Sequence, residues 1–198
     1  RKMKIGILAL QGAFIEHKTM LERLGCGSFE IRKKEDVKAM DGLILPGGES
    51  TVMTKLLHEL ALYEPLSCMI RNGLPVFGTC AGLILLAKDV IGGKTCFGCM
   101  DITARRNAYG RQLGSFRTKG YMAGIGTIPM VFIRGPYIEH AGDRAEVLAR
   151  VEGHIVAARQ DNMLVVSFHP ELIPDERLHS FFLDMAAKYR AEKTARAI

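Results

Sequence analysis

The sequence predicts an α/β fold, with helices flanking a doubly wound, mostly parallel central sheet that carries an antiparallel extension. In the first part of the chain, short apolar runs alternate with stretches whose apolar residues recur at helical spacing. In the last part, strand-like runs follow one another across short turns. The 198 residues fit a single domain, 1–198, and a hydrophobic content of 48% suffices for a sizeable core.

The first half of the chain has the pattern of strands that alternate with helices. Lys4 to Leu10 is a nearly continuous apolar run, as expected for a strand buried on both faces of a parallel sheet. The apolar residues that follow recur every three or four positions until Gly25, which is suited to end a helix. Ser50 or Thr51 is the expected cap of a later helix. Further strands are expected at 29–32, 41–45 and 73–78, and further helices at 51–63, in the short segment that follows, and at 82–88.

The second half predicts mainly strands. Residues 91–126 are rich in glycine and polar residues, which indicates loops and short strands. Glu152-Gly153 and Gln160 to Asn162 are expected hairpin turns between the last three strands. A closing amphipathic helix is expected from Leu178 to Tyr189, with a charged tail that frays from Lys188. The expected strands are 127–134, 145–151, 154–159 and 163–168.

The charge and hydropathy exclude several classes of function. The net charge is +6, but the basic residues are scattered and lack the interleaved aromatic residues of a nucleic-acid groove. We therefore expect a solvated basic surface, or a face for an acidic partner or an anionic metabolite, and no nucleic-acid partner. No apolar run approaches the roughly 20 residues of a membrane helix, so we expect a cytoplasmic protein without a membrane partner.

The five cysteines do not predict a disulfide framework. Their number is odd and their spacing irregular, which favours reduced thiols in a reducing compartment. Cys96 and Cys99 form a single CxxC without a second pair or a nearby pair of histidines. Two small apolar side chains around a loop are the preferred interpretation, with metal or redox use as the alternative, and no metal site is predicted.

The segment from Gly78 to Gly82 carries the clearest chemical signal. Gly78-Thr79-Cys80-Ala81-Gly82 lies between an apolar strand and a helix, as a Gly-x-Cys-x-Gly form of the nucleophile elbow. Such a turn exposes the Cys80 thiol at a helix N-terminus, which favours the thiolate, and it directs the Ala81 N–H toward a developing oxyanion. The alternative is a buried structural cysteine in a glycine-flanked turn.

A thiolate that attacks an amide needs a base that later protonates the leaving ammonia. His169 ends a predicted strand, just before Pro170 and two residues before Glu171. Proline favours an extended conformation at His169, which would place Glu171 on the same side to orient the imidazole. An ordinary strand-end turn is the alternative. The other histidines are predicted to be surface or structural residues: His17, His58, His140, His154 and His179.

Taken together, these segments resemble a known family. Gly78 to Gly82 and Phe168-His169-Pro170-Glu171 resemble the class I, triad-type glutamine amidotransferases. Four further segments are similar to the glutaminase subunit of pyridoxal 5'-phosphate synthase, and the six motifs run in order from residue 4 to residue 172. The four are Leu8-Ala9-Leu10-Gln11-Gly12-Ala13, Leu45-Pro46-Gly47-Gly48-Glu49-Ser50-Thr51, Arg106-Asn107-Ala108-Tyr109-Gly110-Arg111-Gln112 and Phe132-Ile133-Arg134-Gly135-Pro136.

The resemblance implies a flavodoxin-like, class I glutamine amidotransferase fold and the hydrolysis of L-glutamine to L-glutamate and ammonia. It implies Cys80 as nucleophile, His169 as base and acid, and Glu171 as the group that orients His169. Gly48 and Ala81 are implied as the oxyanion hole. The residues implied to hold glutamine are Gly48, Glu49, Ser50, Arg106, Ile133 and Arg134, since an arginine suits the α-carboxylate and a carboxylate the α-ammonium.

The resemblance also implies a partner, a β/α-barrel synthase that receives the ammonia through a channel and builds pyridoxal 5'-phosphate from two sugar phosphates. No cofactor is implied for this chain, which carries no P-loop and no dinucleotide fingerprint. Docking of the synthase is implied to order the oxyanion hole near Gln11.

Two alternatives stay open at this point. The first is the glutaminase of another complex, such as imidazole glycerol phosphate synthase, and the segment from Arg106 to Gln112 argues against it. The second is a non-catalytic scaffold that kept the fold, which the intact set of Cys80, His169 and Glu171 disfavours.

Overall fold

The centre of the molecule is a parallel sheet, as the continuous apolar runs predicted. The computed structural model describes residues 2–106 and 115–198, so the predicted motif residues Asn107 to Gln112 lie outside the described part. The parallel strands lie in the order β2-β1-β3-β4-β12. Their bounds are Lys4–Leu8 for β1, Gly27–Ile31 for β2, Gly42–Leu45 for β3, Val76–Thr79 for β4 and Met163–Val166 for β12.

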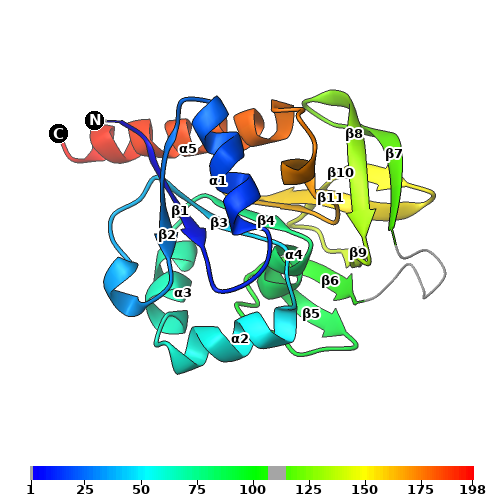
Figure 1. Cartoon of the computed structure of the whole chain (residues 1–198), viewed down its shortest axis with the longest axis horizontal. Helices are drawn as coiled ribbons and strands as arrows, with labels where there is room; N and C mark the ends of the chain where they lie inside the picture. The colour runs from blue at the N-terminus through cyan, green and yellow to red at the C-terminus, as the bar shows by residue number, and fades with distance from the viewer. Residues whose placement is uncertain (1, 107–114) are drawn as a thin grey trace.

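Helices cover both faces of this sheet, so the predicted doubly wound α/β class is confirmed (Figure 1). Successive residues of one strand point to opposite faces. Ile44 therefore packs with the helices on one side, whereas Leu43 and Leu45 pack with those on the other. One side holds α1 (Phe14–Arg23) and α5 (Arg177–Arg196), and the other holds α2 (Ser50–Glu59), α3 (Tyr63–Arg71) and α4 (Ala81–Leu86).

The antiparallel extension continues the sheet from β12 in the order β11-β10-β7-β8. Both predicted hairpin turns are present, and Glu152, Gly153 and Asp161 have φ values of 51°, 81° and 52°, as tight turns between strands require. The strands are β7 (Ser115–Met122), β8 (Gly126–Ile133), β10 (Glu146–Val151) and β11 (His154–Gln160).

Two strands depart from the sequence prediction, and a third lies within residues 91–126, where loops and short strands were expected. The helix expected at 82–88 ends at Leu86, and the chain continues as β5 (Ala87–Ile91). This strand pairs with β6 (Met100–Arg105), which in turn pairs with β9 (Tyr137–Ala141). The pairing of β6 with β9 joins segments far apart in the sequence, which no local pattern could reveal.

Two helix ends also differ from expectation. The cap of α2 is Glu49, whose carboxylate accepts hydrogen bonds from the Thr51 and Val52 N–H groups, and not Ser50 or Thr51. The last helix does not fray at Lys188 but continues to Arg196. Short 3-10 turns, η1 (Lys34–Asp36) and η2 (Pro170–Leu172), complete the described elements.

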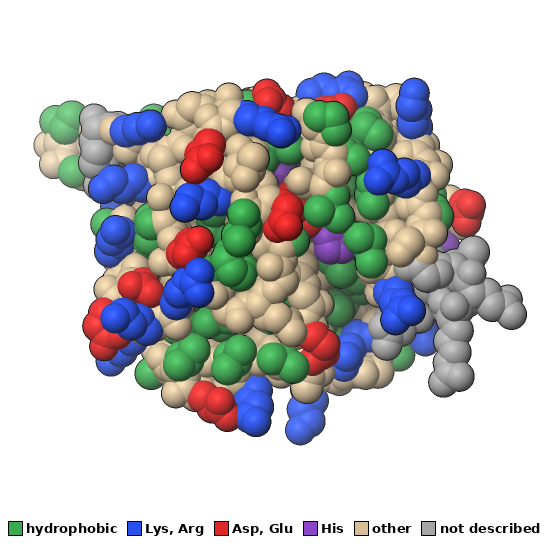
Figure 2. Space-filling view, viewed as in Figure 1, with side chains coloured by type: hydrophobic (Ala, Val, Ile, Leu, Met, Phe, Trp, Pro, Cys, Tyr) green, Lys and Arg blue, Asp and Glu red, His purple; other side chains and the backbone are tan. Residues whose placement is uncertain are grey.

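The molecular surface mixes the two signs of charge. Figure 2 shows Lys and Arg side chains interspersed with Asp and Glu over the visible face, so the net charge of +6 is dispersed there. None of the described helices combines the length and hydropathy that a membrane span needs.

The order of the strands sets the position of the site. β3, β4 and β12 are parallel neighbours, so their carboxyl ends meet at one edge of the sheet. β4 leads directly into α4, and this tight turn depends on glycine. A Cβ at Gly82 would overlap the Leu45 carbonyl oxygen, and one at Gly78 would lie 2.7 Å from the Gly82 carbonyl group. The close packing of α4 against β3 and β4 therefore excludes larger residues at both positions.

Gly82→Ala is expected to lower the free energy of unfolding by about 3 kcal/mol, because the added methyl group forces α4 away from β3. The matched control is Gly153→Ala, where a Cβ meets no atom within 4 Å and only the positive φ of 81° is unfavourable. In that control, the free energy of unfolding is expected to fall by only about 1 kcal/mol. Urea unfolding of both variants measures the difference, and equal losses would contradict the packing argument.

Candidate active site

Cys80 occupies a strained turn at the start of α4. Its φ of 53° and ψ of −103° lie in a region that residues other than glycine rarely adopt. The Cys80 N–H donates to the Val166 carbonyl oxygen at 2.9 Å, which anchors the turn to β12. The side chain is mostly buried, with 8% of the residue exposed. The predicted elbow geometry is therefore present, and the turn fixes the direction of the thiol.

His169 and Glu171 follow the neighbouring strand β12. The His169 N–H donates to the Val131 carbonyl oxygen at 2.8 Å, and His169 Nδ1 lies 2.6 Å from Glu171 Oε1. The extended chain expected after His169 is wrong in part, because Pro170 begins the turn η2. The turn still brings Glu171 to the imidazole, with Oε1 within hydrogen-bond distance of Nδ1.

The structure brings Cys80 next to this pair. Burial disfavours a charged imidazole, but hydrogen bonds to Cys80 and Glu171 outweigh it and raise the pKa of His169 to about 10. His169 therefore carries a positive charge at neutral pH, and its ring hydrogen-bonds both the Cys80 sulfur and the Glu171 carboxylate. This is the charge distribution that a nucleophilic cysteine with a histidine partner needs.

The glycine loop after β3 closes over the two side chains. A Cβ at Gly47 would lie 2.5 Å from His169 Cε1 and 3.5 Å from Cys80 Cβ. Only a glycine backbone fits this gap, so the loop reaches the sulfur without a side chain in between. The predicted oxyanion residues, Gly48 and Ala81, directly follow Gly47 and Cys80 in the sequence.

The Gln11 segment is tied to the same loop. The Gln11 Oε1 atom accepts a hydrogen bond from the Glu49 N–H at 2.5 Å, and the Ala13 N–H donates to the Gly47 carbonyl oxygen at 3.3 Å. The segment of residues 11–13 therefore fixes the position of the glycine loop. Its sequence was recognised as a motif, but this contact was not predicted.

Glu49 and Arg106 form an ion pair with an N–O distance of 3.2 Å. Burial works against the Glu49 charge, but hydrogen bonds from the Thr51 and Val52 N–H groups and the Arg106 charge lower the pKa of Glu49. Arg106 also donates to Thr51 Oγ1 at 3.2 Å. The structure therefore brings three of the predicted glutamine residues together, since Ser50 lies between Glu49 and Thr51 in the sequence.

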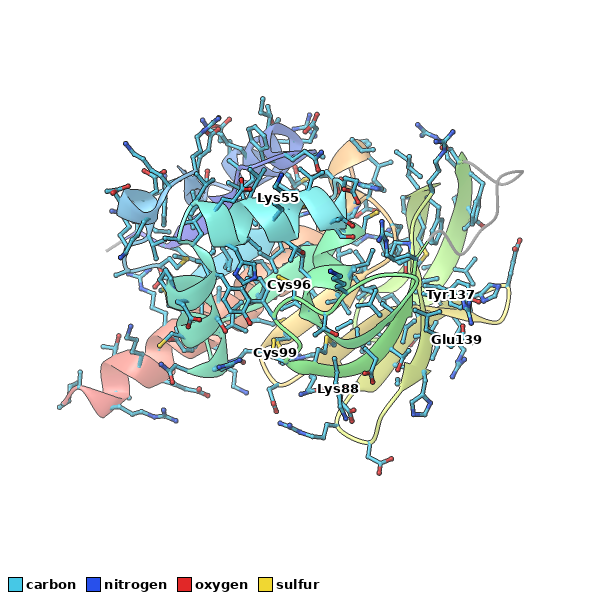
Figure 3. The ribbon with its side chains drawn as sticks, turned by 90° about the horizontal axis from the view of Figure 1, so that it is seen from below. Lys55, Lys88, Cys96, Cys99, Tyr137 and Glu139 are labelled. Atoms are coloured by element: carbon cyan, nitrogen blue, oxygen red, sulfur yellow. The ribbon has the colours of Figure 1, made fainter. Side chains whose placement is uncertain are left out.

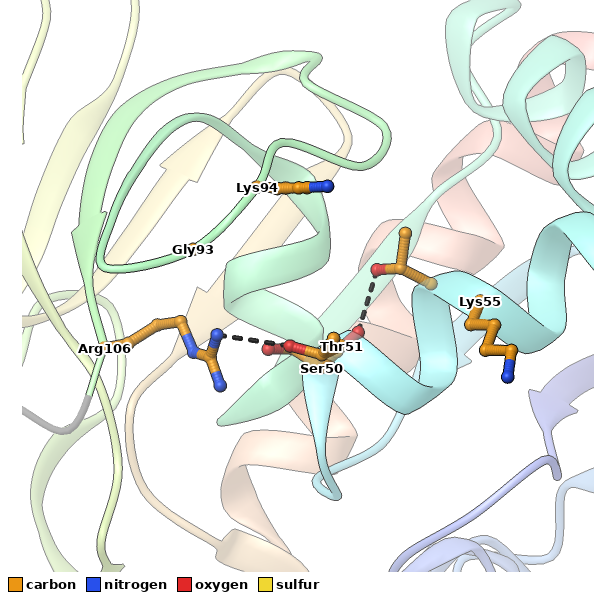
Figure 4. A pocket seen from close by; sticks show the side chains of 7 residues that line it. Ser50, Thr51, Lys55, Gly93, Lys94 and Arg106 are labelled. Atoms are coloured by element: carbon orange, nitrogen blue, oxygen red, sulfur yellow. Dashed lines mark hydrogen bonds between the residues drawn. The ribbon is translucent and has the colours of Figure 1, made fainter.

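Ser50, Thr51 and Arg106 border a cavity of about 430 Å³ (Figure 4). Its walls are the first turns of α2, with Ser50 and Lys55, and the loop at Gly93 and Lys94. Arg106 points across it toward Thr51, to which the dashed line runs in Figure 4. The cavity is polar and cationic on one side, which suits a ligand that carries a carboxylate.

Ile133 and Arg134 lie where β8 ends. Ile133 is 39% exposed, and Arg134 has a φ of 42°, which turns the chain sharply. The turn brings Gly135 close to the nucleophile, because a Cβ at Gly135 would lie 4.0 Å from the Cys80 sulfur. The segment thus borders the thiol through its backbone.

Two histidines form a buried polar cluster behind Glu171. His17 and His179 are both fully buried, which agrees with the predicted structural role, but their place beside the site was not predicted: His17 lies next to Thr79 and the Glu171 carboxylate, and His179 contacts His17. Neither residue lies near another chemical motif in the sequence, so only the fold reveals their position.

Cys96 and Cys99 lie between β5 and β6, where Figure 3 labels both. Burial raises the pKa of the Cys96 thiol, and it raises that of Cys99 to about 11. Within the described ranges, no group of three or more His, Cys, Asp or Glu residues could hold a metal ion. The two thiols are therefore poor nucleophiles and fit the interpretation as small packing residues.

Known proteins resemble this chain over nearly its whole length. A relative from Methanocorpusculum labreanum, named pyridoxal 5'-phosphate synthase subunit PdxT, is 62% identical over 93% of this chain and 98% of its own. One of the same name from Haemophilus influenzae is 56% identical over 92% and 98%.

Solved structures agree with these relatives. A crystal structure of a glutamine amidotransferase has a TM-score of 0.88 and 44% identity, covering 92% of this chain and 98% of its own. The structure of PurLQS from Thermotoga maritima, at 13% identity and a TM-score of 0.73, covers 93% and 99% and shares the fold. The model of the SNO glutamine amidotransferase family matches residues 7–188. The resemblance inferred from the motifs is thus confirmed, and the chain belongs to the SNO glutamine amidotransferase family.

Proposed function

We propose that this chain is a glutaminase that hydrolyses L-glutamine to L-glutamate and ammonia, with Cys80 as nucleophile, His169 as acid and base, and Glu171 as the group that orients His169. The observation that carries the proposal is the contact of these three side chains at the strained turn after β4. Membership in a glutamine amidotransferase family supports the choice of substrate.

In the first step, the Cys80 thiolate attacks the side-chain carbonyl carbon of glutamine, and a C–S bond forms. The carbonyl oxygen becomes an oxyanion that accepts hydrogen bonds from the Gly48 and Ala81 N–H groups. The tetrahedral intermediate collapses as His169 gives its proton to the nitrogen. The C–N bond breaks, ammonia leaves, and a thioester remains on Cys80.

In the second step, His169 is neutral and acts as a base. It takes a proton from water while the water oxygen attacks the thioester carbonyl. The C–S bond breaks, L-glutamate leaves, and the Cys80 thiolate and the His169 imidazolium are restored. Glu171 stabilises the imidazolium in both steps through its 2.6 Å hydrogen bond, and it does not itself transfer a proton.

The ion pair of Glu49 and Arg106 suits the head group of glutamine. A free amino acid carries an α-ammonium and an α-carboxylate on one carbon, and the pair offers the opposite charges 3.2 Å apart. Arg106 would bind the α-carboxylate and Glu49 the α-ammonium, with Ser50, Ile133 and Arg134 lining the path to the sulfur. Glu49 keeps its bonds to the α2 N–H groups in this arrangement, since a carboxylate accepts several donors.

The partner is proposed from the names of the relatives, which are subunits of pyridoxal 5'-phosphate synthase. Ammonia released at Cys80 would pass through a channel to a β/α-barrel synthase that builds pyridoxal 5'-phosphate. The chain itself would need no cofactor. Glutaminase activity is therefore expected to rise when the synthase is added.

Cys80→Ala is expected to abolish glutamate release from glutamine in the presence of the synthase, because the acyl-enzyme can no longer form. The control is Cys68→Ala, which removes an exposed thiol on α3 and is expected to keep full activity. A glutamine-analogue diazo-ketone is expected to label Cys80 and no other residue. Glutamate release by Cys80→Ala, or none by the unmodified chain with its synthase, would refute the proposal.

Glu171→Gln is expected to lower the pKa of His169, because the carboxylate that stabilises the imidazolium is replaced by a neutral amide. The unmodified chain should titrate near 10 and the variant at least about one unit lower. NMR titration of the imidazole nitrogens measures both values, with the signal assigned by its loss in His169→Gln. An unchanged pKa would show that Glu171 does not act on His169.

Arg106→Lys is expected to raise the KM for glutamine about tenfold with a smaller change in kcat, because an ammonium cannot form two parallel hydrogen bonds to a carboxylate. Arg105→Lys is the matched control, since Arg105 pairs with the exposed Glu139 at 2.8 Å (Figure 3 labels Glu139). Equal effects of the two substitutions on KM would exclude Arg106 as the carboxylate ligand.

A further inference from the structure

A buried polar cluster lies behind Glu171, on the side away from Cys80. It joins His17 of α1, His179 of α5 and Thr79 of β4. The two histidines are 162 residues apart in the sequence, and both are 0% exposed. Burying an imidazole costs free energy unless its ring nitrogens have hydrogen-bond partners. The contacts within the cluster therefore indicate which ring nitrogens carry a proton.

The distances describe a chain of contacts that ends on the carboxylate. His17 Nδ1 lies 2.8 Å from His179 Nε2, and His17 Nε2 lies 3.2 Å from Thr79 Oγ1. The same Nε2 atom lies 3.6 Å from Glu171 Oε2. Glu171 Oε1 faces His169, whereas Oε2 has no hydrogen-bond partner among the described residues. At 3.6 Å, His17 Nε2 is beyond hydrogen-bond distance of the outer carboxylate oxygen, but an N–H there is close enough to stabilise its negative charge.

Both histidines are neutral. Burial, with His179 and His169 nearby, lowers the pKa of His17 well below its usual value, and burial lowers that of His179 to about 4. The ring of Phe77, which also packs against the cluster, is uncharged and stands edge-on to both imidazoles. A neutral His17 offers a donor without adding a second positive charge beside Glu171.

The contacts also select one tautomer of each ring. If His17 carries its proton on Nε2, the proton points at Thr79 and Glu171, and Nδ1 accepts from the His179 Nε2–H. The unpartnered His179 Nδ1 is then a bare acceptor. In the opposite tautomer, His17 would turn a lone pair toward the carboxylate and His179 would bury an unpaired N–H, which costs more.

We propose that His17 is a positioning residue whose Nε2–H, directed between Thr79 and Glu171, stabilises the outer oxygen of Glu171 electrostatically, so that the inner oxygen stays turned toward His169, and that His179 fixes the tautomer of His17. The inference rests on the proposed glutaminase, since it gives Glu171 its orienting role. A buried carboxylate with one bonded oxygen could rotate about its Cγ–Cδ bond. Contact with His17 on the far side removes that freedom.

The test is His17→Phe, which keeps a ring of similar size and removes both nitrogens. With the synthase present, kcat is expected to fall about tenfold, while the KM for glutamine stays within about twofold. In the isolated chain, the pKa of His169 is expected to fall by about one unit. A folded variant with unchanged kcat and an unchanged His169 pKa would overturn the proposal and leave His17 a packing residue.

Two further variants separate positioning from packing. His17→Gln restores an N–H donor near Nε2 and is expected to regain kcat to within about threefold of the unmodified chain. His179→Phe leaves His17 in place but frees its tautomer, so an intermediate loss is expected. If His17→Phe does not fold, kcat and the His169 pKa are measured in His179→Phe instead. Unchanged values of both in that variant would overturn the proposal.

His58→Phe is the matched control. His58 is exposed on α2 and stacks on Tyr63, far from the chemistry, so this variant is expected to keep both kcat and the His169 pKa. The NMR measurement needs neither glutamine nor a partner. A chain without glutaminase activity in which His17→Phe still lowers the His169 pKa would therefore refute the proposed function and leave the positioning role standing.

Discussion

The candidate site depends on one constraint, the left-handed backbone of Cys80 between β4 and α4. A non-glycine residue in this conformation costs about 1–3 kcal/mol, so the surroundings must hold it. Here the Cys80 N–H donates to the Val166 carbonyl oxygen, and the Leu83 N–H donates to the Cys80 carbonyl oxygen at 3.1 Å. Gly78 and Gly82 let α4 pack directly on the sheet. The direction of the thiol is thus set by backbone contacts to β12, the strand that also carries His169.

Much of this arrangement could be predicted from the sequence, because its signals are local. A continuous apolar run marks a strand buried on both faces, and a glycine-flanked cysteine after such a run marks the turn. His169 was found by its place at a strand end beside proline and an acidic residue. Neighbouring parallel strands then bring Cys80 and His169 to one edge, which is a property of the fold class.

The remainder depends on contacts between distant segments. Strands β6 and β9 pair across a long stretch of sequence, and the composition of β5 and β9 is too mixed to mark them as strands. Glu49 was expected only to bind substrate, yet it also caps α2, because its carboxylate reaches two free N–H groups of the first turn. No sequence pattern indicated that His17 and His179 lie near the site, because the two residues come together behind Glu171 only in the folded chain.

The meeting of His17 with His179 has a consequence for biosynthesis. His17 lies in α1 and His179 in α5, so the cluster forms only after the segment that carries α5 has been synthesised and has packed against α1. A nascent chain that ends before α5 keeps the imidazole of α1 without its neighbour. On the proposed role of His17, the orientation of Glu171 is therefore set only once α1 and α5 have packed together.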